Sequence, residues 1–142
     1  MRMPAKVLLV DDSSADIDLT REALAQSHLT AHVIVAMNGV DALTILRQQL
    51  AEMLPDLVIL DLNLPGKDGR TVLCELKNDP GLRATPVVVF STSAAHQDVR
   101  LCYELGANCY VTKPGNLKEF MAAVASIGNY WFNFTRLPRE ED

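Results

Sequence analysis

Short apolar runs alternate along the chain with segments whose apolar residues recur every third or fourth position. The runs lie at 6–10, 57–60 and 87–90, and apart from Lys6 every residue in them is apolar. Runs of this length are typical of strands covered on both faces, as in a parallel sheet. Two further strand candidates, 31–36 and 108–112, are more polar, so we expect them nearer the sheet edges.

The segments between these runs carry a helical period. Apolar spacings of three or four occur at Leu43, Leu46, Leu50 and Met53, at Val72, Leu73 and Leu76, and at Val99, Cys102 and Tyr103. The last and longest stripe comprises Leu117, Phe120, Met121, Val124, Ile127 and Trp131. Ser13 or Ser14 can cap a first helix that runs to about Ser27. Strand and helix alternate five times, which predicts an α/β fold: a doubly wound parallel (βα)5 sheet with right-handed crossovers.

Length and composition limit the function classes. The 142 residues fit a single domain, 1–142, with a core at 6–128, a short aromatic extension at 129–142 and no output domain. The net charge is −5 with no run of like charges, which argues against a nucleic-acid surface. Three cysteines without CxxC spacing form neither a disulfide framework nor a zinc site. With no signal peptide and no apolar run of ~18 residues, we expect a cytoplasmic protein without membrane contact.

Polar side chains gather where the predicted strands end. In open parallel sheets, ligands bind beyond the carboxyl ends of the strands. The first, third, fourth and fifth strands deliver Asp11 and Asp12, Asp61, Ser91 and Thr92, and Lys113 with Pro114. Each of these alone could be a helix cap or an ordinary turn. Their joint occurrence at the ends of four strands predicts one site.

Three close carboxylates repel one another and favour a bound cation. Carboxylate and carbonyl oxygens suit Mg²⁺, whereas the lack of His or Cys at this rim disfavours zinc. A metal, an ammonium and a hydroxyl together can hold the oxygens of a phosphoryl group in transfer. Asp61 stands alone on the central strand, so it is the best candidate for the nucleophile that becomes an acyl phosphate.

Four motifs resemble the receiver domains of two-component response regulators. They are the Leu-Leu-Val-Asp-Asp run at 8–12, the stretch 61–69, Ser-Thr-Ser at 91–93 and Thr-Lys-Pro at 112–114. The resemblance covers 6 to about 128 and implies the flavodoxin-like receiver fold with strand order 2-1-3-4-5. It also implies that the protein is not an enzyme but a stand-alone phosphoacceptor, which takes its phosphoryl group from a sensor histidine kinase and removes it by self-dephosphorylation.

The resemblance assigns roles to individual residues. Asp61 is the expected phosphoacceptor, and Mg²⁺ is bound by Asp61, directly by Asp12, through water by Asp11, and by the backbone carbonyl of Asn63. Lys113 pairs with the phosphoryl group, across an expected cis peptide bond to Pro114. Ser91 is expected to swing toward the phosphoryl group while Tyr110 moves inward. Thr92 is bulkier than the residue often found at its position, which bears on the rate of dephosphorylation.

Residues 15–24 and the C-terminal aromatic residues resemble a narrower group, which includes the response regulators of bacterial and cyanobacterial phytochromes. Such proteins often pair through the fourth and fifth helices and the last strand. We therefore expect a homodimer and a phytochrome-type kinase partner. The expected dimer and output face comprises Cys102, Tyr103, Tyr110, Trp131, Phe132 and Phe134. The alternative is that the tail folds back on its own chain.

Three other functions use similar features. A haloacid-type aspartyl-phosphate hydrolase needs a second Asp two residues after the nucleophile, where this chain has Asn63. A flavodoxin-like cofactor binder needs a phosphate-cradling loop after the first strand, where Asp11 and Asp12 would repel phosphate. A pseudo-receiver that acts only as an adaptor has no need of clustered carboxylates.

Overall fold

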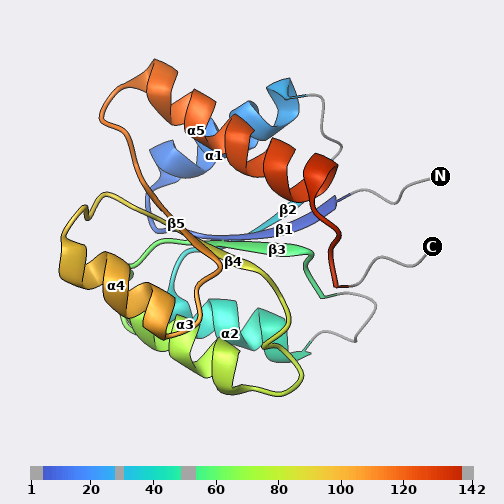
Figure 1. Cartoon of the computed structure of the whole chain (residues 1–142), viewed down its shortest axis with the longest axis vertical. Coiled ribbons are helices and arrows are strands. Elements are labelled where there is room, and N and C mark those ends of the chain that lie inside the picture. Colours follow the sequence, from blue (N-terminus) through green and yellow to red (C-terminus); the bar gives the residue numbers. More distant parts are fainter. Residues whose placement is uncertain (1–4, 28–30, 49–53, 139–142) are drawn as a thin grey trace.

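The computed structural model describes residues 5–27, 31–48 and 54–138. A parallel five-stranded sheet runs through its centre in the order β2-β1-β3-β4-β5 (Figure 1). The strands are β1 (Ala5–Val10), β2 (Ala31–Ala36), β3 (Leu57–Leu60), β4 (Val87–Ser91) and β5 (Cys109–Thr112). The predicted fold class and strand order are confirmed. The two more polar strands, β2 and β5, form the edges as expected.

Five helices cover the two faces of the sheet. They are α1 (Ser14–Gln26), α2 (Gly39–Gln48), α3 (Gly69–Asn78), α4 (His96–Glu104) and α5 (Leu117–Asn129). Helices α1 and α5 lie on one face, and α2, α3 and α4 lie on the other (Figure 1). Residues that alternate along each central strand point to opposite faces. They divide the core into two apolar clusters, one under each helical layer.

Local signals explain where the helices begin. The Ser13 side chain accepts the N–H of Asp16 at 3.2 Å, and the Asp68 side chain accepts that of Arg70 at 2.7 Å. Asn116 caps α5 by accepting the N–H of Glu119 at 2.8 Å. These bonds satisfy N–H groups that have no partner within the helix. Helix α1 thus begins and ends within one residue of its prediction.

The last helical stripe is only partly buried. Phe120, Val124 and Ile127 face the core, but Leu117 is 61% exposed. Leu117 is exposed because it occupies the first position of α5, where the helix begins. Leu50 and Met53, predicted to extend the second helix, lie outside the described residues.

The C-terminal segment folds back on its own chain. After α5 comes a π-helical turn (Tyr130–Phe134). Phe132 is 4% exposed and packs with Leu137 into the α1/α5 cluster, and Trp131 is partly buried against the same cluster. Phe134, in contrast, is 74% exposed. The assignment of Phe132 to the dimer face is therefore corrected, because the side chain is already buried in the core of its own chain.

Cys102 is a second correction to the expected dimer face. Its side chain is fully buried in the cluster under α2, α3 and α4, because it lies on the inner side of α4. Its neighbour Tyr103 is 50% exposed and remains available at the surface. Tyr110 packs against the same cluster as Cys102, whereas Trp131 packs on the opposite face of the sheet. The aromatic residues thus divide between the two faces.

No helix in the described part of the chain is long and apolar enough to span a bilayer.

Candidate functional site

Three carboxylates meet at the carboxyl ends of β1 and β3. Asp11 and Asp61 are 2% and 8% exposed, whereas Asp12 is exposed. Each contributes an oxygen to a group of atoms that lie within 4.8 Å of one another. Backbone pairing fixes this arrangement, because the N–H of Asp61 donates to the carbonyl of Val10 at 2.9 Å and continues the β1–β3 ladder. The predicted convergence of these residues is present in the structure.

Lys113 reaches the same rim from β5. Its Nζ donates to Oδ2 of Asp11 at 2.7 Å, of Asp16 at 2.8 Å and of Asp61 at 3.2 Å. Its side chain is only 4% exposed. Burial on its own lowers the pKa of Lys113, but the hydrogen bonds to Asp11 and Asp16 and the negative charges of Asp11 and Asp61 together raise it more, so the pKa lies above its ordinary value. Lys113 is therefore a fixed positive charge in the site.

Backbone groups orient the Asp61 carboxylate. Its Oδ1 accepts the N–H of Leu62 at 2.7 Å and that of Asn63 at 3.4 Å, while Oδ2 faces Lys113. Gly69 allows the loop to close over this strand end, since a Cβ at Gly69 would lie 2.2 Å from the carbonyl oxygen of Asp61. The start of α3 therefore packs directly on the backbone that carries Asp61.

Asp11 is held in a similar way. Its Oδ1 accepts the N–H of Ser13 at 2.9 Å and its Oδ2 accepts from Lys113. Burial raises the pKa of Asp11, and the hydrogen bonds from Lys113 and Ser13 counter only part of that rise. A buried carboxylate of this kind gains from an additional positive charge. The site is thus electrostatically suited to a cation.

The donor set fits a hard divalent cation. The three clustered groups are all carboxylates, and the described part of the chain places no His or Cys in this cluster. Oxygen-only sets favour ions such as Mg²⁺, Mn²⁺ and Ca²⁺ over zinc. Asp12 and Asn63 are both exposed, which leaves room for water in the coordination shell.

The hydroxyl side of the site lies at the end of β4. Ser91 is fully buried and its Oγ accepts the N–H of Ser93 at 3.3 Å, while Thr92 is exposed. The Tyr110 hydroxyl donates to the carbonyl of Ser93 at 2.7 Å. Ser93 thus links the two residues, Ser91 and Tyr110, that were predicted to move together.

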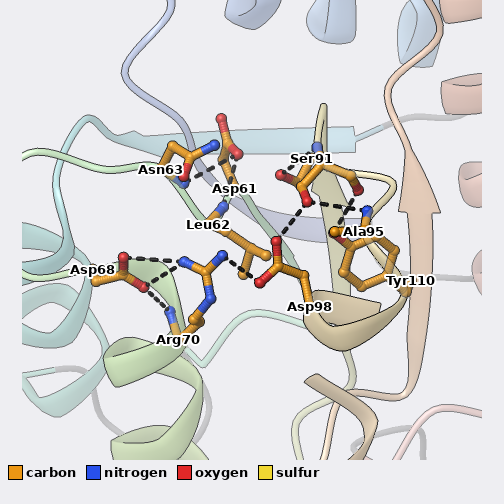
Figure 2. A network of polar contacts seen from close by, with 10 residues as sticks. Asp61, Leu62, Asn63, Asp68, Arg70, Ser91, Ala95, Asp98 and Tyr110 are labelled. Atoms are coloured by element: carbon orange, nitrogen blue, oxygen red, sulfur yellow. Dashed lines mark hydrogen bonds and ion pairs between the residues drawn. The ribbon is translucent and has the colours of Figure 1, made fainter. Parts of the chain in front are cut away.

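A polar network connects this loop to the loop that follows Asp61 (Figure 2). The Ser93 hydroxyl donates to Asp98 Oδ2 at 2.6 Å, and Arg70 Nη2 donates to Asp98 Oδ1 at 2.9 Å. Arg70 also contacts both carboxylate oxygens of Asp68 through Nη1, at 3.2 and 3.1 Å. The N-terminal turns of α3 and α4 are therefore joined by the Arg70–Asp98 ion pair.

Sequence reasoning missed Asp16, Arg70 and Asp98. None of them stands at a strand end, and each looks like an ordinary charged residue in the first turn of a helix. Asp16 and Lys113 are 97 residues apart, and Arg70 and Asp98 are 28 apart. Only the packing of the helices beside the sheet brings these charges together, so no local signal reveals them.

The expected cis bond before Pro114 is not present. No described peptide bond is cis, so the Lys113–Pro114 bond is trans and this prediction was wrong for the structure. The trans isomer is the lower in free energy for an ordinary X–Pro bond, by about 0.5–1 kcal/mol.

The sheet order, the carboxylate cluster and the buried lysine together define a receiver domain, and comparison with known proteins agrees. The family model of the response regulator receiver domain matches residues 7–125. The chain therefore belongs to the response regulator family. Receiver domains of this family are in general phosphoacceptors without enzymatic activity on other molecules, which argues against the hydrolase and flavodoxin-like alternatives.

Individual relatives cover nearly all of the chain. It is 44% identical over 138 residues to the response regulator Rcp1 of Synechocystis sp., covering 95% of this chain and 94% of Rcp1. A crystal structure of the phosphorylated cyanobacterial phytochrome response regulator RcpA matches with a TM-score of 0.90 and 45% identity, covering 96% of this chain and 99% of RcpA. The Mn²⁺-bound form of Rcp1 matches with a TM-score of 0.89 and 43% identity, covering 95% and 99%.

Proposed function

We propose that Asp61 accepts a phosphoryl group from a sensor histidine kinase. The observation that carries this is that Asp61 contacts Lys113 and belongs to the same cluster of carboxylates as Asp11 and Asp12. A carboxylate oxygen of Asp61 attacks phosphorus, the P–N bond of the phosphohistidine breaks, and its electron pair returns to the imidazole. The product is an acyl phosphate on Asp61.

The residues around Asp61 have separate tasks. The N–H groups of Leu62 and Asn63 hold the nucleophile in place, and the fixed positive charge of Lys113 neutralises a phosphoryl oxygen. Mg²⁺ bound by Asp11, Asp12, Asp61 and the Asn63 carbonyl supplies charge neutralisation for the transferring oxygens. Within this set Asp12 would bind the ion directly, as would Asp61 and the Asn63 carbonyl, and Asp11 would act through water. The same groups support slow self-dephosphorylation, with exposed Thr92 limiting the approach of water.

The signal passes from the site to the α4–β5–α5 face. Phosphorylation adds negative charge beside the buried Ser91, whose hydroxyl turns to donate to a phosphoryl oxygen. Ser93 follows because its N–H is bonded to Ser91, and the Tyr110 hydroxyl loses or shifts its bond to the Ser93 carbonyl. Tyr110 then moves inward and the exposed surface around Tyr103 changes.

We propose a phytochrome-type histidine kinase as the partner. The support is the similarity to RcpA, which is named as a cyanobacterial phytochrome response regulator and is 45% identical over 96% of this chain. Such a kinase acts in the cytoplasm, where we place this protein. In this chain the receiver domain is the signalling unit, and residues 129–142 form a short extension of it.

A homodimer is part of the proposal. Its support is the exposed apolar surface of Leu101 and Tyr103 on α4, and of Tyr130 and Phe134 after α5. Phe134 at 74% exposure is costly in an isolated molecule. Deleting the tail after Ile127 would be a poor test of the dimer, because it would remove the buried Phe132 together with the exposed residues. A sharper test changes Tyr103 and Phe134 to Ser and measures the molecular mass by light scattering. The dimer proposal predicts a fall from the mass of a dimer toward that of a monomer.

The experiment that tests the function uses a purified phytochrome-type kinase, labelled on its histidine with ³²P. Transfer to the wild-type chain is expected, and Asp61→Asn should take up no label. The variant Asp18→Asn, which changes an exposed aspartate of α1, should be labelled like wild type. Label on Asp61→Asn at the wild-type rate would contradict the assignment of Asp61. If the wild-type chain takes no label from the phytochrome-type kinase but is still phosphorylated by a small phosphodonor, its partner is a different class of kinase.

A further inference from the structure

Asp16 is a fourth carboxylate at the site that the roles given above leave unused. It lies in the first turn of α1, and its N–H is capped by the Ser13 side chain. Its Oδ2 lies 2.8 Å from Lys113 Nζ, closer than the 3.2 Å between Lys113 and Asp61. The Asp16 side chain is 28% exposed, so the pair sits at the edge of the pocket rather than in free solvent.

The ammonium of Lys113 is fully occupied. A lysine has three N–H donors, and here each has a carboxylate acceptor: Asp11, Asp16 and Asp61. Two of these acceptors belong to the cluster that fits a divalent cation, and Asp16 does not. Lys113 and a cation therefore compete for the oxygens of Asp11 and Asp61, while the bond to Asp16 is free of that competition.

Burial makes the extra acceptor necessary. With a side chain 4% exposed, Lys113 cannot replace lost carboxylate contacts with bulk water. An ammonium that gives up contacts in such a place without another anionic partner loses much of its stabilisation. Asp16 supplies that partner from a rigid helix that packs against α5 and the sheet.

We propose that Asp16 is a positioning residue, whose carboxylate retains Lys113 at the rim and thereby frees Asp11 and Asp61 to bind the divalent cation needed for phosphoryl transfer. This inference rests on the proposed function, because it concerns the same cation. Removal of the Asp16 charge weakens cation binding in two ways. It takes one negative charge from the neighbourhood of the cation, and it leaves Lys113 more dependent on Asp11 and Asp61.

The test is the affinity of the unphosphorylated chain for Mn²⁺ and for Mg²⁺, measured by isothermal titration calorimetry at neutral pH. Asp16→Asn is expected to weaken binding about fivefold relative to wild type, because it removes one negative charge from the network that Lys113 shares with Asp11 and Asp61. Asp18→Asn is the matched control. It makes the same charge change on the same helix at an exposed residue that is not an acceptor of Lys113. It should change the affinity less than twofold.

Further variants separate charge from structure. Asp16→Glu keeps the carboxylate and should bind within about twofold of wild type, since the charge remains near the ion. Circular dichroism checks the fold, and Asp16→Ser replaces Asp16→Asn if the latter does not fold. Equal affinities for Asp16→Asn and Asp18→Asn, or tighter binding by Asp16→Asn, would overturn the inference. Wild-type protein that binds neither ion would contradict the proposed function itself, and with it the role of Asp16.

Discussion

Arg70 Nη2 lies 2.9 Å from Asp98 Oδ1 and joins the first turn of α3 to the first turn of α4. The other oxygen of Asp98 accepts the Ser93 hydroxyl at 2.6 Å. Through Ser93 this ion pair reaches the hydroxyls of Ser91 and Tyr110. The loop that must rearrange in the proposed switch is therefore tied to the helix that begins just after the phosphoacceptor loop (Figure 2).

The pKa of Asp98 reports on this connection. The Ser93 hydrogen bond and then Arg70 hold the pKa of the Asp98 carboxyl below its usual range. We expect Arg70→Gln to raise the pKa of Asp98 toward its ordinary value, measured from the carboxyl carbon shift in an NMR titration. Arg100→Gln is the control, because Arg100 pairs with Glu104 on the exposed side of the same helix. An unchanged Asp98 pKa in Arg70→Gln would show that Ser93 alone sets it.

The same shift predicts the pH dependence of stability. The folded-state pKa of Asp98 lies below its unfolded value of about 3.9, so the ionised carboxylate favours the folded state above that pH. The contribution is lost as pH falls through the folded-state pKa. Urea unfolding of Asp98→Asn should therefore show a smaller loss of stability on acidification below about pH 4 than wild type. Identical acid slopes in the two proteins would contradict this.

Lys113→Met tests the competition between lysine and cation. Removal of the ammonium leaves the buried Asp11 and Asp61 without their partner, so the apo protein should lose about 3 kcal/mol of stability. The same change removes a repelling charge, so Mg²⁺ should bind about tenfold more tightly. Calorimetry and urea unfolding with and without Mg²⁺ measure both effects. Lys118→Met, at an exposed lysine, should alter neither, and weaker Mg²⁺ binding by Lys113→Met would count against the account.

The two tail phenylalanines should differ sharply in their effect on stability. Phe132 is 4% exposed in its own core and Phe134 is 74% exposed. Truncation of a buried phenylalanine creates a cavity, so Phe132→Ala should lower the free energy of unfolding by about 3 kcal/mol. Phe134→Ala should change it by less than about 0.5 kcal/mol. Equal and small losses for both variants would mean that the tail does not pack on its own chain in solution.

Thiol accessibility tests the corrected position of Cys102. Its side chain is fully buried, and burial raises the pKa of its thiol. Because only the thiolate reacts rapidly, Cys102 should be protected from an aromatic disulfide reagent in the folded protein. In a variant with Cys74 and Cys109 changed to Ser, modification should follow the rate of unfolding. Fast labelling of the folded variant would show that Cys102 is exposed and would contradict its buried position.

The sequence alone was enough to predict the fold and the centre of the site. Asp11, Asp61 and Lys113 could be brought together because parallel strands deliver their carboxyl ends to one edge of the sheet. That rule depends only on finding the strands, and the continuous apolar runs located them to within about one residue.

Features that depend on helix packing could not be predicted in the same way. Asp16 and Asp98 occupy first turns, where an acidic residue is common for reasons of helix electrostatics alone. Cys102 and Tyr103 are adjacent in a helical pattern, and sequence does not tell which of them turns inward. Phe132 was assigned to a partner because an apolar tail needs cover, but its own core provides that cover through a π-helical turn.

The most direct measurement is the intact mass of the chain after incubation with acetyl phosphate and Mg²⁺, which requires no kinase. The account predicts the addition of one phosphoryl group to wild type and to Asp18→Asn, none to Asp61→Asn, and none to wild type when a chelator removes the cation. A phosphoryl group on Asp61→Asn at the wild-type rate, or labelling of wild type that does not depend on the cation, would contradict it.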